Sequence, residues 1–308
     1  MPGQARDDIL KPDDLKHNAG GKETCPMIEL RAGRLRCELQ PGLGGAIAGF
    51  WRDDVPLLRS TPAAQLTSSR LAACLPLVPF SNGVGHASVV WQGTLQPQVH
   101  HGGDPLLAIH GAAAQRPWSV LEQDDASAML AYEHRGDASW PFAFDCSHTL
   151  RLDAQGLEMT LAVTNQSGRP APAGLGWRPA FVQRSASRLA FRASAQWEFD
   201  GDRLPVRRLP AEGVQGDIAA LAPPACFDGW DGVARIEDEL VALRLQSELT
   251  RLVVGRDAGG FTVAPVSHVP NAVHRYATGA STAELGLAIL QPGESLMAQL
   301  TITLEGAA

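Results

Sequence analysis

Cysteine is scarce in this chain: five copies are spread over 308 residues, and none forms a C-x-x-C pair. An odd, widely spaced set gives little support to a disulfide framework or to a structural zinc site. The nine histidines show no H-x-H or H-x-x-x-H spacing that would build a metal cluster locally. We therefore predict that the protein binds no metal.

Long apolar runs are absent as well. No stretch approaches the roughly 20 apolar residues that a membrane-spanning helix needs. Residues 1–22 are polar and charged, without the apolar segment of a secretory signal, so we expect a cytoplasmic protein. The 26 basic and 33 acidic residues give a formal net charge of −7. This charge offers no positive field to nucleic acid or to an anionic membrane, and we expect neither as a partner.

The signatures of nucleotide binding and serine hydrolysis are missing too. The sequence contains no G-x-S-x-G motif and no P-loop. Gly174-Leu-Gly176 lacks the third glycine and the following helix of a dinucleotide-binding fingerprint. We therefore predict no cofactor.

What the sequence does contain is alternation of apolar and polar residues, which is typical of half-buried strands. The runs at 35–39, 157–163 and 298–304 are the clearest examples. Glycine (31 copies) and proline (22 copies) are scattered between such runs, as expected where turns join short strands. Residues 214–221 could form two helical turns before a pair of prolines ends them. We predict an all-β fold with little helix.

The domain organisation follows from the same pattern. Residues 1–26 contain two Asp-Asp pairs and almost no apolar periodicity, so we predict a flexible N-terminal tail. From residue 27 onward there is no fixed-period repeat, no low-complexity segment and no Gly/Ser linker that would divide the chain. We therefore predict a single domain over residues 27–308.

Three segments place a polar side chain in apolar company. Asn82 follows the run P-L-V-P-F-S, His110 ends an apolar run beside a glycine, and Arg178 lies between tryptophan and proline. An arginine in such surroundings indicates either a partner carboxylate or a ligand anion. From the residues alone, an ordinary turn explains Asn82 equally well. A lone histidine such as His110 is more often structural than catalytic.

Two further segments have a composition that suits sugars. Trp177 and other tryptophans could offer apolar faces to sugar C–H groups, although most tryptophans form core. The segment Cys226-Phe-Asp228-Gly-Trp-Asp231-Gly places two carboxylates around a tryptophan, which suits sugar hydroxyls. Because Asp-Gly is also a common hairpin turn, the turn is the better interpretation before any resemblance is considered.

Taken in chain order, the segments are P-L-V-P-F-S-N, H-G followed by R-P-W, N-x-S-G, G-L-G-W, C-F-x-G-W-D-G, S-H-V-P-N-A and Q-P-G-E-S. Their order and spacing, from about residue 27 to residue 304, resemble the aldose 1-epimerase (galactose mutarotase) family. The resemblance implies a β-supersandwich that interconverts the α and β anomers of free aldoses without a cofactor. In that reaction a base takes the anomeric hydroxyl proton while an acid protonates the ring oxygen, so that the ring opens, the C1–C2 bond rotates and the ring recloses.

Four positions depart from the family pattern. The resemblance places the catalytic acid, a histidine, at Arg178, and a guanidinium cannot pass a proton at neutral pH. It places the catalytic base, a glutamate, at Ala264, whose methyl group accepts no proton. The family's sugar-binding aspartate falls at Pro224, and the arginine after its site asparagine falls at Gly83.

Other positions agree with the family pattern. Asn82 and His110 match the family's site, and His268 lies in a matching segment with a titration range suited to proton transfer. The resemblance therefore implies His110 and His268 as candidate catalytic residues. The candidate sugar-binding residues are Asn82, Arg116, Trp177, Arg178, Asp228 and Asp231.

Three functions remain open at this point. The first is a mutarotase with a rebuilt acid–base pair, such as His110 with His268 or Asp231. The second is a non-catalytic carbohydrate-binding protein in which Arg178 contacts an acidic sugar or a sugar phosphate. The third is an interaction protein with a vestigial site and unknown protein partners. Acid and base catalysis typically contribute about 10²- to 10⁴-fold each. We therefore predict a protein that acts on or binds an aldose or a sugar derivative, with mutarotation weak, altered or lost.

Overall fold

A computed structural model describes residues 26–85, 88–91, 94–97, 107–138, 140–202, 204–220, 224–257 and 260–306. The predicted N-terminal tail, except for Pro26, lies outside the described residues. Strands dominate, and the α-helices within the described residues are α1 (Ala272–Ala277) and α2 (Thr282–Leu285). The prediction of an all-β fold with little helix is confirmed. No helix in the described part of the chain is long and apolar enough to cross a membrane.

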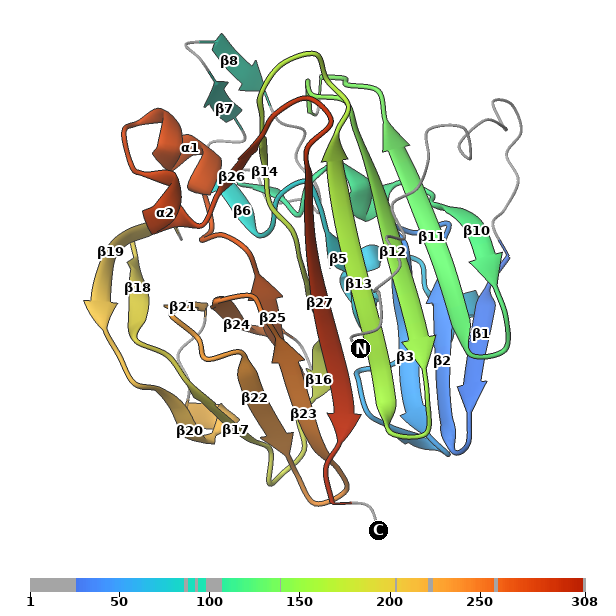
Figure 1. The fold of residues 1–308 in the computed structure, drawn as a ribbon. Helices are drawn as coiled ribbons and strands as arrows, with labels where there is room; N and C mark the ends of the chain where they lie inside the picture. The colour runs from blue at the N-terminus through green and yellow to red at the C-terminus, as the bar shows by residue number, and fades with distance from the viewer. Residues whose placement is uncertain are drawn as a thin grey trace, which may run out of the picture.

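The larger sheet has nine antiparallel strands in the order β10-β11-β12-β13-β27-β23-β22-β17-β20 (Figure 1). The predicted strands at 157–163 and 298–304 are both confirmed as parts of β13 and β27, and they pair with each other. The bounds are β10 (Ser119–Gln123), β11 (Ser127–His134), β12 (Phe144–Leu152), β13 (Gly156–Asn165), β17 (Arg188–Arg192), β20 (Gly213–Asp217), β22 (Val233–Glu237), β23 (Ala242–Ser247) and β27 (Ser295–Leu304).

The second sheet has eight strands in the order β19-β18-β21-β24-β25-β15-β5, with β16 also paired to β25. Their bounds are β5 (Pro76–Leu77), β15 (Gly176–Trp177), β16 (Ala180–Val182), β18 (Ala195–Phe199), β19 (Pro205–Pro210), β21 (Ala225–Asp228), β24 (Arg251–Asp257) and β25 (Gly260–Val266). The chain crosses between the two large sheets several times, for example from β21 to β22. The two sheets therefore share one core, as in a β-sandwich.

Smaller elements complete the fold. A four-stranded sheet in the order β1-β2-β3-β4 contains the predicted strand at 35–39, and three strand pairs, β6-β9, β7-β8 and β14-β26, lie outside the large sheets. Their bounds are β1 (Ile28–Ala32), β2 (Leu35–Gln40), β3 (Ala46–Arg52), β4 (Val55–Pro56), β6 (Gly83–Gly85), β7 (Ser88–Trp91), β8 (Thr94–Pro97), β9 (Leu107–Ile109), β14 (Ala171–Ala173) and β26 (Ala288–Leu290). The 3₁₀ helices are η1 (Ala63–Gln65), η2 (Ser69–Leu71), η3 (Ala112–Gln115) and η4 (Ile218–Ala220).

The core is continuous and rich in large side chains, which supply most of the apolar area removed from water. Alternation places its residues: in β13 the side chains of Leu157, Met159, Leu161 and Val163 are buried while those between them are partly exposed. The largest fully buried side chains are Trp118, Trp140, Trp177, Trp197, Phe50, Phe80, Phe142, Phe181 and Phe261.

The two helical turns predicted over 214–221 are wrong for residues 214–220, and residue 221 lies outside the described residues. Residues 213–217 form β20, which pairs with β17, and only Ile218–Ala220 make a 3₁₀ turn. Gly213 has a φ of +98°, and a Cβ there would overlap the carbonyl oxygen of Phe191. A helix this short is unstable alone, so pairing with the neighbouring strand decides the conformation.

Candidate functional site

Neighbouring strands of the eight-stranded sheet bring two departures from the family pattern together. Gly176 of β15 pairs with Val266 of β25. The strands are antiparallel, and Ala180 of β16 pairs with Thr262 of β25 in the same register. Arg178, midway between Gly176 and Ala180, therefore lies opposite Ala264. The Arg178 N–H donates to the carbonyl oxygen of Leu75 at 2.9 Å, which continues the sheet on the other side. The positions that the family pattern gives to the acid and the base therefore face each other across two strands.

Strand alternation separates Trp177 from Arg178, its neighbour in sequence. Trp177 is fully buried, and its Nε1–H donates to Nε2 of His148 on β12 at 3.1 Å. Burial lowers the pKa of His148 to about 3, so this imidazole is neutral and can accept the bond. Trp177 thus points into the core between the two large sheets. It offers no ring face to a ligand here, and the structure does not bring it together with Arg178.

Asn82 and His110 do lie together, at the start of β6 and the end of β9. The His110 N–H donates to the Asn82 carbonyl oxygen at 3.2 Å, and the Asn82 N–H donates to Nδ1 of the His110 ring at 3.2 Å. Both residues are partly buried and have left-handed backbones, with φ of +59° and +69°. Such conformations are uncommon for residues other than glycine and concentrate at functional sites.

His268 is joined to the same turn from the end of β25. Its Nε2 accepts the Ser81 N–H at 3.1 Å, and its Nδ1–H donates to the Val269 carbonyl oxygen at 2.7 Å. The residue is 1% exposed, and burial lowers its pKa to about 4. The structure therefore places the His268 ring in contact with Ser81, the residue before Asn82. The ring is neutral, and both of its nitrogens form hydrogen bonds.

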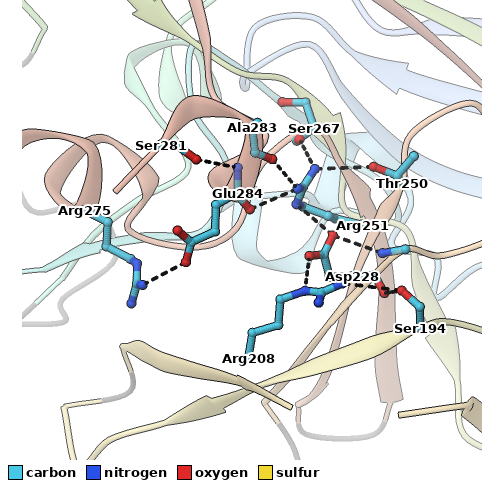
Figure 2. A network of polar contacts seen from close by, with 11 residues as sticks. Ser194, Arg208, Asp228, Thr250, Arg251, Ser267, Arg275, Ser281, Ala283 and Glu284 are labelled. Atoms are coloured by element: carbon cyan, nitrogen blue, oxygen red, sulfur yellow. Dashed lines mark hydrogen bonds and ion pairs between the residues drawn. The ribbon is translucent and has the colours of Figure 1, made fainter. Parts of the chain in front are cut away.

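Asp228 lies at the centre of a buried polar network (Figure 2). Its carboxylate pairs with Nε of Arg208 at 2.8 Å and with Nε of Arg251 at 3.3 Å. The remaining guanidinium nitrogens of Arg251 donate to the carbonyl oxygens of Ser267 and Glu284, both at 3.2 Å. Through its two arginine partners, the Asp228 carboxylate links β19, β21, β24 and α2. The structure thus gives the Asp228 side chain structural partners.

Asp231 and Arg116 occupy separate places. Asp231 is exposed and accepts the Val233 N–H at 3.2 Å in the turn that carries the chain from one large sheet to the other. Arg116 forms an ion pair with Asp137 and contacts the Tyr132 hydroxyl at 3.5 Å. These last three residues line a pocket of about 430 Å³ at the ends of β10 and β11.

The remaining departures from the family pattern lie in the backbone around the site. Gly83 begins β6, where it pairs with Ile109 and its carbonyl oxygen accepts the Asn271 N–H at 2.8 Å. Pro224 stands immediately before β21. Neither residue has a side chain that can bind a sugar by charge.

Sequence patterns did not point to Ser81, Arg208 or Arg251. Each of them meets its partner across a long stretch of chain: Ser81 and His268 are 187 residues apart. A buried arginine needs a partner, but the sequence around Arg251 gives no sign that this residue is buried. The glycine at position 286 is an indirect sign of the buried arginine, because a Cβ at Gly286 would overlap the Arg251 guanidinium.

Comparisons with known proteins agree with this architecture. The family model for aldose 1-epimerase matches residues 26–217. The uncharacterized protein YphB of Escherichia coli (strain K12) is 33% identical over 284 residues, which cover 85% of this chain and 93% of YphB.

Solved structures show the same fold. A crystal structure of an Escherichia coli K12 protein proposed to be an aldose 1-epimerase has a TM-score of 0.81 at 28% identity, covering 92% of this chain and 99% of that one. A galactose mutarotase-like protein from Clostridium acetobutylicum has a TM-score of 0.78 at 18% identity, covering 91% and 95% of the two chains. Because the aldose 1-epimerase family model covers more than half of the chain, the chain belongs to the aldose 1-epimerase family.

Proposed function

We propose that the protein binds an aldose or a sugar derivative through Asn82, His110 and Arg178, and that its mutarotation is weak, altered or lost. The observation that supports this most directly is the placement of Arg178 opposite Ala264. Ring opening needs one group that takes a proton and one that gives a proton. Ala264 can do neither, and the guanidinium of Arg178 remains protonated at neutral pH.

The groups that remain are suited to binding. Asn82 carries an amide that both donates and accepts, and His110 carries a ring nitrogen beyond the one bonded to the Asn82 N–H. His268 keeps both of its ring nitrogens in contacts with the backbone. A proton relay through His268 would have to break one of these contacts, which favours a structural role for this ring.

The test measures exchange between anomers directly. Two-dimensional exchange NMR on a panel of neutral aldoses, with and without protein, reports the rate of interconversion at each anomeric signal. We expect little or no acceleration over buffer, together with protein-dependent shifts of the sugar signals that Asn82→Ala reduces. A turnover of about 1–10³ s⁻¹, typical of enzymes, would contradict the loss of activity. If none of the sugars tested binds to the protein, the proposed binding site is wrong.

A second candidate function is recognition of an acidic sugar or a sugar phosphate. Relative to the family pattern, an arginine in place of histidine and an alanine in place of glutamate make the facing positions 178 and 264 more positive. Such a change favours a carboxylate or phosphate group, which an arginine can bind with two parallel hydrogen bonds.

This second candidate predicts a selective loss. Arg178→Met removes the charge but keeps an unbranched side chain, and it should weaken binding of uronic acids or hexose phosphates about 10- to 150-fold, the value of one charge-assisted hydrogen bond. Neutral sugars should bind as before. Arg235→Met, in an exposed pair with Glu305, is the matched control. Equal affinities of the two variants for all acidic sugars tested would exclude the role of Arg178.

A further inference from the structure

Two consecutive backbone N–H groups, those of Ser81 and Asn82, each donate to an imidazole. The Ser81 N–H reaches Nε2 of His268 at 3.1 Å, and the Asn82 N–H reaches Nδ1 of His110 at 3.2 Å. A ring nitrogen that accepts a hydrogen bond carries no proton of its own. The two contacts therefore specify where the protons are on both rings.

For His110 the consequence is a single tautomer. Because Nδ1 accepts the Asn82 N–H, the proton of the neutral ring lies on Nε2. The other tautomer, or a second proton on the ring, would set two N–H donors against each other at Nδ1. The ring thus presents an N–H donor at Nε2, the kind of group that binds a sugar hydroxyl or ring oxygen.

For His268 the tautomer is the opposite one. Its Nδ1–H donates to the Val269 carbonyl oxygen at 2.7 Å, which leaves Nε2 as the acceptor for Ser81. The ring is 1% exposed, and its pKa is lowered to about 4 by burial, so it keeps this neutral form at pH 7. His268 is therefore a fixed acceptor beneath the turn that bears Asn82.

Gly174 makes room for this ring. A Cβ at Gly174 would overlap Cδ2 of His268, and the Gly174 N–H donates to the carbonyl oxygen of Pro79 at 2.7 Å. The first glycine of the G-L-G-W motif thus packs under His268 and also holds the chain that leads into Ser81. Glycine, histidine and the turn form one packed unit.

From this geometry we propose that His268 is a positioning residue: by accepting the Ser81 N–H, it holds the backbone so that the Asn82 N–H fixes His110 as the Nε2-protonated tautomer. The inference rests on the proposed function, because the tautomer matters to a sugar only where His110 contacts it. The tautomer itself is a property of the free protein and can be measured without any sugar.

Long-range ¹H–¹⁵N correlation spectra of protein labelled with ¹⁵N-histidine distinguish the two neutral tautomers by the shifts of the ring nitrogens. The His110 signals are assigned from their loss in His110→Ala. We expect the wild-type protein at pH 7.5 to show His110 as the Nε2–H form alone. His268→Phe, which keeps a ring but removes the acceptor, should convert His110 to a mixture of tautomers. His268→Gln, whose amide oxygen can accept the Ser81 N–H, should restore the single form.

Two more variants protect the test against simple loss of stability. Gly174→Ala displaces the His268 ring without changing a histidine, and it should also broaden the His110 tautomer distribution. His134→Phe removes another buried histidine bonded to a backbone carbonyl, that of Trp140 at 2.6 Å, and it should leave His110 unchanged. A wild-type His110 in the Nδ1–H form would overturn the proposal. So would a pure Nε2–H form that survives in folded His268→Phe, even if sugar binding is intact.

Discussion

Replacing Arg251 by methionine should be among the most destabilising single substitutions in this protein. Arg251 is 7% exposed and lies 3.3 Å from the Asp228 carboxylate through Nε. Removing it leaves the buried carboxylate with the Gly229 N–H and with Arg208, whose side chain is 46% exposed. Breaking a buried ion pair by removing one partner costs about 3–5 kcal/mol. The carbonyl oxygens of Ser267 and Glu284 lose their donors as well.

The assay is urea unfolding followed by tryptophan fluorescence, with the midpoint and the slope fitted separately. Arg251→Met should lower the free energy of unfolding by about 3–5 kcal/mol. Asp228→Asn keeps the shape and one acceptor, so it should cost less, about 1–3 kcal/mol. Hydrogen exchange should increase first in residues 267–286, because Arg251 binds the backbone at both ends of this segment.

The matched control is again Arg235→Met. Arg235 pairs with Glu305 at 3.1 Å, but its side chain is 56% exposed, and exposed pairs contribute about 0–1 kcal/mol. Equal shifts of the urea midpoint in Arg251→Met and Arg235→Met would refute the reasoning. They would mean that burial of the Arg251 guanidinium adds nothing to the value of its contacts.

Three further predictions concern acid, catalysis and thiols. Burial lowers the pKa of His148 to about 3 and that of His268 to about 4, so the unfolded chain binds more protons than the native protein below pH 6.5. The free energy of unfolding should therefore fall as the pH decreases from 6.5 toward 4. A melting temperature that stays constant over that range would contradict this. Restoring the family's acid and base in Arg178→His/Ala264→Glu should raise the rate of anomer exchange above that of the parent, and the two single variants are the controls. A thiol reagent should react in the native protein only slowly, and in urea rapidly, with the buried thiols of Cys37, Cys74, Cys146 and Cys226.

Much of the fold could be predicted because strand signals are local. Alternation at 157–163 and 298–304 identified both strands, since every second side chain must enter the core. Alternation could not show that the two strands pair with each other, because it carries no information about which strand is the neighbour. The helix predicted over 214–221 failed for the same reason: the pairing of Phe191 with Val214 on a neighbouring strand outweighs a weak local preference.

The candidate site was only partly accessible from the sequence. The match to the family pattern located Asn82 and His110, and the structure places them in mutual contact. Alternation along β15 already separates Trp177 from Arg178, so the burial of Trp177 follows once the strand is known. The two arginines that pair with Asp228 lie 20 residues or more away in the sequence, and no local pattern predicts such contacts.

The central position of β27 has a consequence for how the chain folds. β27 is inserted between β13 and β23, so the nine-stranded sheet consists of two blocks that only this late segment joins. Until β27 arrives, β13 and β23 each expose an unpaired edge of the kind that recruits other chains. Closing the nine-stranded sheet therefore requires pairings between segments far apart in the sequence, which are slow to form, and the two unpaired edges favour aggregation until then.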